Sequence, residues 1–196
     1  MRSLSNFLFL LWILLLPTQL TYHIFTPDSY VAGYRIDYYA IKIFANDLIL
    51  ILLFSISLLQ ADFRKYLLKI TSSHSSKIKL LLILYLLNLT FSINQQLTIQ
   101  SLIPITFLIT NFLTSYYYLL RVNIKYLISI YTFQLSILAL LCLYQFQTNH
   151  SFNSLAYWLG ERPISIVMSG IAKQEIFNMY KVRPYATFSH PNSLAG

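Results

Sequence analysis

Charged residues are scarce in this chain of 196 residues, and their scarcity indicates its class. Only 10% of the residues are charged, 57% are hydrophobic, and the mean hydropathy is +0.59. A soluble domain carries about 25% charged residues. Because the deficit is concentrated in long apolar runs, the sequence predicts an integral membrane protein.

Three further absences each exclude a class of function. The one cysteine, Cys142, can form no intrachain disulfide and has no companion ligands for a metal site. No Lys, Arg, Asp or Glu stands in the middle of an apolar run, which argues against an ion-coupled transporter. The formal net charge of +8 is not arranged as a basic stripe, so we expect no nucleic-acid partner.

The apolar runs predict an all-α, multispan helical membrane protein with about five transmembrane helices, since each run approaches the ~20 residues that a span needs. We expect one polytopic domain with spans at residues 4–22, 43–59, 78–97, 102–120 and 124–146. Five basic residues in the stretch 60–79 surround a polar linker, 71–76, between the second and third spans. Inside the runs, Asn88, Asn111 and Gln134 are expected to bond neighbouring helices.

The first run resembles a signal peptide, because Arg2 is followed by ten apolar residues, 7–16. No small-x-small cleavage site follows it. We therefore interpret it as an uncleaved helix that is kinked at Pro17.

The basic residues predict the orientation of the chain. With a cytoplasmic N-terminus, eight basic residues lie inside, namely Arg2, Arg64, Lys65, Lys69, Lys77, Lys79, Arg121 and Lys125. Only two, Arg35 and Lys42, lie in short outer loops. The positive-inside rule therefore puts the N-terminus in the cytoplasm and residues 147–190 outside.

Two polar stretches are expected on the extracytoplasmic side. The connector 23–42 is rich in aromatic residues and belongs at the headgroup level. Its Arg35 and Asp37 are either a functional pair or ordinary loop charges. In the longer stretch, 171–180 has a mixed apolar and charged face, so we expect a short helix lying in the interface.

The densest group of chemically active residues is the stretch 183–196, R-P-Y-A-T-F-S-H-P-N-S-L-A-G. Arg183 offers a planar fork of donors that matches a phosphate. A helix that begins at Pro191 points its free N–H groups toward the same space. His190 is a candidate general base or phosphate donor, and Thr187 and Asn192 add neutral hydrogen bonds. The alternative is an interface arginine followed by a helix cap.

This stretch resembles the R-x-x-G-T-F-x-H-P-N-x-L-A-G signature of the bacterial O-antigen ligase and polymerase superfamily. Ala186 departs from it, since glycine is usual there. Similar upstream elements are Pro17-Thr18-Gln19-Leu20, Arg35-Ile36-Asp37-Tyr38 and Gly160-Glu161-Arg162. The resemblance implies a helical membrane glycosyltransferase on the outer face of the bacterial inner membrane. Such enzymes move a glycan from an undecaprenyl-pyrophosphate carrier to a lipid, glycan or protein acceptor.

The resemblance also implies roles for single residues. Arg183 matches an arginine that holds the pyrophosphate, His190, Asn192 and Thr187 match motif positions, and Arg35 joins them as a substrate-binding candidate. No metal or cofactor is implied. The family's large outer loop, with its acceptor-activating histidine, would follow this stretch, so the catalytic residues stay unassigned. We therefore expect an N-terminal fragment, ending at the start of a sixth helix, that is inactive by itself.

Three functions remain open at this point. The first is a ligase, and the second is a polymerase of the same superfamily that differs only in its acceptor. The third, from another class, is a non-catalytic membrane protein or a component of a polysaccharide or lipid transporter.

Overall fold

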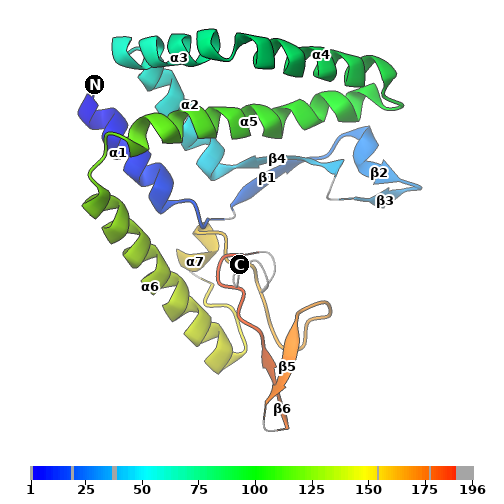
Figure 1. Cartoon of the computed structure of the whole chain (residues 1–196). Coiled ribbons are helices and arrows are strands. Elements are labelled where there is room, and N and C mark those ends of the chain that lie inside the picture. The colour runs from blue at the N-terminus through cyan, green and yellow to red at the C-terminus, as the bar shows by residue number, and fades with distance from the viewer. Residues whose placement is uncertain (1, 19, 37–38, 154, 177, 189–196) are drawn as a thin grey trace. The chain divides into compact units, whose positions relative to one another are not determined.

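The computed structural model describes residues 2–18, 20–36, 39–153, 155–176 and 178–188. They are mostly helical, as the sequence predicts (Figure 1). By their contacts they divide into two compact units. Unit 1 comprises Met1–Phe9, His23–Ile43 and Asp47–Val122. Unit 2 comprises Leu10–Tyr22, Phe44–Asn46 and Asn123–Gly196.

The helices are α1 (Arg2–Leu14), α2 (Ala45–Leu58), α3 (Ala61–Ser73), α4 (Ser75–Phe91), α5 (Gln95–Leu119), α6 (Ile124–Thr148) and the short α7 (Leu155–Trp158). A 3-10 turn, η1, covers Pro27–Ser29. Three two-stranded sheets pair β1 (Thr21–Ile24) with β4 (Ile41–Phe44), β2 (Tyr30–Val31) with β3 (Tyr34–Arg35), and β5 (Lys173–Ile176) with β6 (Met179–Val182). The connector 23–42 therefore contains short strands that the sequence analysis did not predict.

The number of candidate spans is lower than expected. In the described part of the chain, α5 and α6 are long and apolar enough to cross a membrane, and the bent pair α2 and α3 counts as a third if taken as one span. The helices α1, α2 and α4 have 13, 14 and 17 residues. At about 1.5 Å per residue, each is shorter than a hydrocarbon core about 30 Å thick. The structure thus corrects the expectation of five spans.

The first helix is shorter than the predicted 4–22 because it ends before Pro17 rather than bending there. Proline has no backbone N–H to donate to the preceding turn. The Leu16 N–H donates to the Ile13 carbonyl at 3.1 Å, and the Thr18 hydroxyl donates to the Leu15 carbonyl at 2.7 Å. These bonds close the helix end, and the chain then enters β1.

The stretch 60–79, including the predicted linker 71–76, is mostly helical. The chain bends by 98° between α2 and α3, next to Gln60, whose backbone is extended. The helices α3 and α4 then lie end to end along α5, with a break at His74 (Figure 1). The Tyr66 hydroxyl donates to the Leu113 carbonyl at 3.1 Å, and the Tyr85 and Ser101 hydroxyls share a 3.3 Å hydrogen bond.

Aromatic rings form the core of unit 1. Phe9 from α1 stacks on Tyr118 from α5, with ring centroids 5.1 Å apart. Phe63 from α3 meets Tyr117 edge-on at 4.8 Å, and Leu53 from α2 is fully buried beside this group of helices. Edge-on and stacked arrangements are those that aromatic quadrupoles favour.

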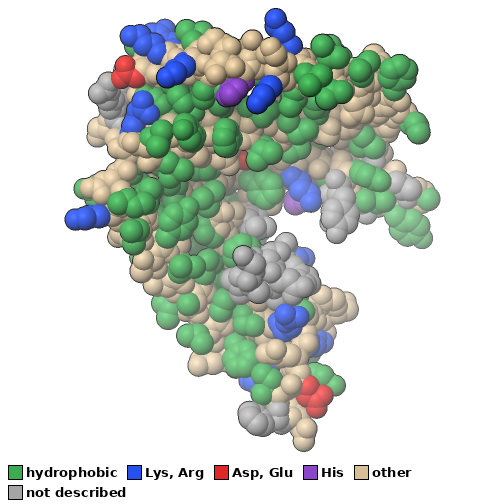
Figure 2. Space-filling view, in the orientation of Figure 1, with side chains coloured by type: hydrophobic (Ala, Val, Ile, Leu, Met, Phe, Trp, Pro, Cys, Tyr) green, Lys and Arg blue, Asp and Glu red, His purple; other side chains and the backbone are tan. Residues whose placement is uncertain are grey.

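The outer surface of the helices is largely apolar. Residues 80–84 of α4 are each between 52% and 58% exposed, although all five are Leu or Ile. Figure 2 shows hydrophobic side chains over α4, with Lys and Arg side chains gathered over α3 and the start of α4. So much exposed apolar surface is typical of contact with lipid.

Unit 2 is built on α6. The Asn123 side chain caps its start by accepting from the Lys125 N–H at 2.9 Å, and Asn149 ends it with a left-handed φ of +60°. Beyond α7, residues 171–180 do not form the predicted interface helix. They form the β5–β6 hairpin, in which Glu175 pairs with Tyr180. Asn178, with φ of +60°, turns the chain where a helix would have to continue.

Candidate functional site

The motif segment, which we define as Arg183–Thr187, follows β6 in unit 2 and is anchored to Ala172, the residue just before the β5–β6 hairpin. The Arg183 N–H donates to the Ala172 carbonyl at 3.0 Å. In return, the Ala172 N–H donates to the Tyr185 hydroxyl at 2.8 Å. Tyr185 is buried and packs with Ile164 and Val182. The arginine thus lies on a backbone that is fixed on both sides.

The centre of this arrangement is Gln145, a fully buried residue in the last turn of α6. Its side-chain oxygen accepts from the Tyr185 and Ala186 N–H groups, both at 2.9 Å. Its side-chain nitrogen donates to the Ala186 carbonyl at 3.2 Å. One carboxamide therefore makes three bonds to two consecutive residues of the motif segment.

Glu161 extends this network to a second loop. Its carboxylate is buried and accepts from the Gln145 side chain at 2.8 Å. It also accepts from the Phe152 and Asn153 N–H groups, both at 2.7 Å. Three donors offset the desolvation of the carboxylate, since buried charges persist only when they are hydrogen-bonded or paired. Gln145 and Glu161 therefore connect α6, the loop 149–153 and the motif segment.

The same bonds hold Ala186 in an unusual backbone conformation. Its φ is +48°, in the left-handed region that glycine adopts without cost and that disfavours residues with a Cβ. The glycine usual at this place in the resembling signature suits that conformation. Here the alanine is kept there by both of its backbone bonds to Gln145, and its methyl group packs against Leu141 and Ala156. Strain of this kind persists where the surroundings determine the backbone.

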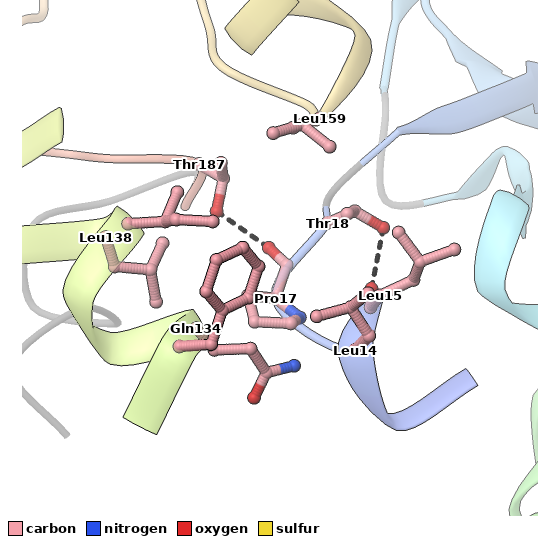
Figure 3. A pocket seen from close by; sticks show the side chains of 10 residues that line it. Leu14, Leu15, Pro17, Thr18, Gln134, Leu138, Leu159 and Thr187 are labelled. Atoms are coloured by element: carbon pink, nitrogen blue, oxygen red, sulfur yellow. Dashed lines mark hydrogen bonds between the residues drawn. The ribbon is translucent and has the colours of Figure 1, made fainter. Parts of the chain in front are cut away.

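An apolar pocket of about 170 Å³ lies beside the motif segment; we call it the Thr187 pocket (Figure 3). Thr187, at the end of the segment, is buried, and its hydroxyl donates to the Pro17 carbonyl at 2.7 Å. This bond links the segment to the chain just after α1. The walls come from the end of α1 and the residues that follow it, from α6, from the residue after α7 and from the end of the motif segment. The lining residues are Leu14, Leu15, Pro17, Thr18, Phe133, Gln134, Ile137, Leu138, Leu159 and Thr187.

The polar atoms at the Thr187 pocket have partners within the protein. The Gln134 side chain donates to the Ile13 carbonyl, which confirms its expected role in joining helices. Asn111, by contrast, accepts from the Ser115 hydroxyl within its own helix, α5. With Gln134 and Thr187 engaged, the pocket presents mainly aliphatic and aromatic carbon. It suits a hydrocarbon chain rather than a charged group.

The structure describes only part of the predicted site, and the substrate-binding roles stay predictions. Arg183 and Thr187 lie in one ordered segment. Arg35 lies in β3, paired with Tyr30, and its side chain is outside what the structure describes. His190, Asn192 and the expected helix from Pro191 also lie outside the described residues, as does Asp37. The structure therefore does not test their predicted roles.

Sequence reasoning missed the residues that hold the segment. Gln145 is one of two amides in the apolar run 124–146, which predicts a helix and gives no sign of the partners of Gln145. Glu161 was noted only within the upstream element Gly160-Glu161-Arg162, yet a carboxylate in a chain with so few charged residues was the signal for a buried anchor. No group of three or more His, Cys, Asp or Glu residues able to hold a metal ion occurs within the described residues.

Comparisons with models of known protein families, with curated proteins and with solved structures find no significant match to this chain.

Proposed function

We propose that this chain takes part in transferring or polymerising an undecaprenyl-pyrophosphate-linked glycan, in the manner of O-antigen ligases. The reaction would occur at the outer face of a bacterial inner membrane. In this proposal the N-terminus is cytoplasmic and the segment after α6 is extracytoplasmic, as the basic residues predict.

One observation carries the proposal: an arginine-bearing motif segment is fixed to the end of a candidate span, α6, and its Thr187 lines an apolar pocket whose wall includes the middle of that helix. Gln145 holds the segment on α6, and Thr187 joins it to the chain after α1. A polyprenyl diphosphate needs an apolar receptor for its chain and a cation for its headgroup. The Thr187 pocket supplies the apolar receptor and Arg183 the cation, and both Thr187 and Arg183 belong to the motif segment.

The chemistry of the proposal is a displacement at the anomeric carbon of the donor sugar. The acceptor hydroxyl oxygen forms a bond to that carbon while the bond to the diphosphate oxygen breaks. Undecaprenyl diphosphate leaves with the bonding electrons, and the hydroxyl proton passes to a general base. Arg183 would stabilise the charge that develops on the departing diphosphate. His190 remains the candidate base within this chain.

The test is glycan transfer by the protein as its own host expresses it, with a matched pair of variants. Arg183→Ala should lower transfer at least about 100-fold, because two charge-assisted hydrogen bonds contribute about 1.5–3 kcal/mol each. Arg183→Lys should recover only part of the loss, since lysine keeps the charge but not the fork. Lys173→Ala removes an equal charge from exposed β5 and should change little.

Two results would remove this function. Unchanged transfer in Arg183→Ala would take the arginine out of the site. An equal loss in Lys173→Ala would indicate a general effect of positive charge. The length distribution of the product separates the two acceptors: a ligase transfers a preformed glycan, whereas a polymerase extends it.

A further inference from the structure

The outward side of α3, in unit 1, is basic. Arg64, Lys65 and Lys69 are exposed, and so is Leu68 among them. These four residues stand at positions i, i+1, i+4 and i+5, which share one side of a helix. We call them the α3 basic face. Figure 2 shows Lys and Arg side chains gathered over this helix.

The opposite side of α3 fixes how the helix is rotated about its own axis. Phe63 is fully buried, and its ring meets that of Tyr117 on α5 edge-on, with centroids 4.8 Å apart. The Tyr66 hydroxyl donates to the Leu113 carbonyl at 3.1 Å. The buried and half-buried residues of α3 form one stripe, with the spacing i, i+3, i+4 and i+7. They are Phe63, Tyr66, Leu67 and Ile70. The α3 basic face therefore points away from α5.

The positive charges of the α3 basic face have few negative neighbours along the chain. The stretch 60–79 contains five basic residues and one acidic residue, Asp62, which already has an interaction within the protein. Lys65 and Lys69 stand one turn apart, and like charges at i and i+4 destabilise a helix. An anion bound from outside would offset this repulsion. The α3 basic face therefore suits an anionic partner, which its charge would attract and orient.

Leu68 distinguishes a lipid surface from a soluble anion as that partner. Its side chain is 70% exposed in the middle of the α3 basic face. A nucleic acid would offer this face negative charge but no hydrocarbon. A bilayer surface offers both, because its phosphates lie directly above its acyl chains. A helix at this level buries apolar side chains while its Lys and Arg side chains reach the headgroups.

The helix that follows α3 continues into a surface suited to lipid. The start of α4 carries exposed Lys77 and Lys79. Directly after them come residues 80–84, all exposed Leu or Ile. A change from cations to apolar side chains within one turn is expected where headgroups give way to hydrocarbon. The same basic residues predict a cytoplasmic location, and the anionic lipids of the cytoplasmic leaflet attract basic segments close to the membrane.

We propose that the α3 basic face binds the surface of a membrane that contains anionic phospholipid, such as phosphatidylglycerol. Arg64, Lys65 and Lys69 contact the phosphates, and Leu68 enters the level just below them. The proposal is independent of glycan transfer, because none of these residues belongs to the motif segment or lines the Thr187 pocket.

The experiment measures which lipids lie next to α3 in the full chain, reconstituted into phosphatidylcholine vesicles. A fluorophore is attached at Ser72→Cys, one turn after Leu68 on the same exposed side, in a Cys142→Ser background. Phosphatidylglycerol or phosphatidylcholine with brominated acyl chains is then included at equal mole fraction as a contact quencher. The ratio of the two quenching efficiencies gives the lipid preference at the α3 basic face.

We expect phosphatidylglycerol to be preferred at least about tenfold, because each basic residue near an anionic surface strengthens binding about fivefold before screening. Raising the salt concentration should reduce the preference, since exposed charges are screened. Equal quenching by the two lipids would overturn the proposal. So would the absence of quenching by either lipid, which is the result expected if water, a nucleic acid or another protein covers this face.

Double variants test whether the charge on α3 is responsible. Lys65→Gln with Lys69→Gln should lower the preference at least about fivefold, whereas Lys65→Arg with Lys69→Arg should keep it. Lys173→Gln with Lys181→Gln removes an equal charge from the β5–β6 hairpin and should change nothing at α3. An unchanged preference in the first double variant, or an equal loss in the hairpin variant, would contradict the α3 basic face as the binding surface.

Discussion

Replacing Gln145 by leucine removes the side chain that holds the motif segment while nearly preserving volume. The substitution leaves the Tyr185 N–H, the Ala186 N–H and the Ala186 carbonyl without their side-chain partner. Each buried polar group left unsatisfied costs about 1–3 kcal/mol. The free energy of opening the segment should therefore fall by at least about 3 kcal/mol. Glu161 keeps its two backbone donors, so the loop that it holds should be less affected.

Hydrogen–deuterium exchange measures this opening directly, because local opening limits exchange of buried amides. A decrease of about 3 kcal/mol corresponds to exchange about 100-fold faster at Tyr185 and Ala186. The matched control is Gln147→Leu, the same substitution at an exposed position two residues away on α6. Unchanged exchange in Gln145→Leu, or equal acceleration in the control, would refute the claim that this carboxamide fixes the segment.

Three further experiments probe other parts of the structure. Thr187→Val removes the bond to the Pro17 carbonyl and should cost about 1 kcal/mol of stability by thermal unfolding; no change in Tm would contradict that bond. A double-mutant cycle of Ser57→Ala and Tyr118→Phe should give a coupling energy of about 0.5–1.5 kcal/mol, whereas strict additivity would mean that the two hydroxyls do not interact. Leu138→Trp places a larger side chain at the Thr187 pocket and should reduce glycan transfer while the chain still inserts into the membrane. Full activity of this variant would exclude the pocket as a substrate site.

The class and the helical character of the protein could be predicted from composition, because hydrophobic runs of this length have few alternatives. Helix lengths could not. Pro17 was expected to bend a helix that instead ends at Leu14. A proline can either kink a helix or end it, so the residue alone does not decide between the two. A linker was predicted at 71–76 from its serines, yet α3 continues to Ser73, with its Phe63 and Tyr66 packed on α5. Tertiary packing decides such cases over local propensity.

The candidate site rests on Arg183 and Thr187, which the sequence predicts to bind substrate, and these roles stay predictions. Its supports were not recognisable, because Gln145 lies 38 residues before Arg183 in the chain and acts through backbone groups that any residue carries. The hairpin at 173–182 was mistaken for an interface helix, since Asn178 marks its turn only once the backbone is seen.

The claim on which the proposed function most depends is that the segment after α6 lies outside the cytoplasm. In a Cys142→Ser background, which removes the one native cysteine, Glu175→Cys places a single thiol on exposed β5 and Lys65→Cys places one on exposed α3. A membrane-impermeant maleimide should label Glu175→Cys in intact spheroplasts and should reach Lys65→Cys only after the membrane is opened. Labelling of Lys65→Cys from outside, with Glu175→Cys protected until lysis, would contradict the account.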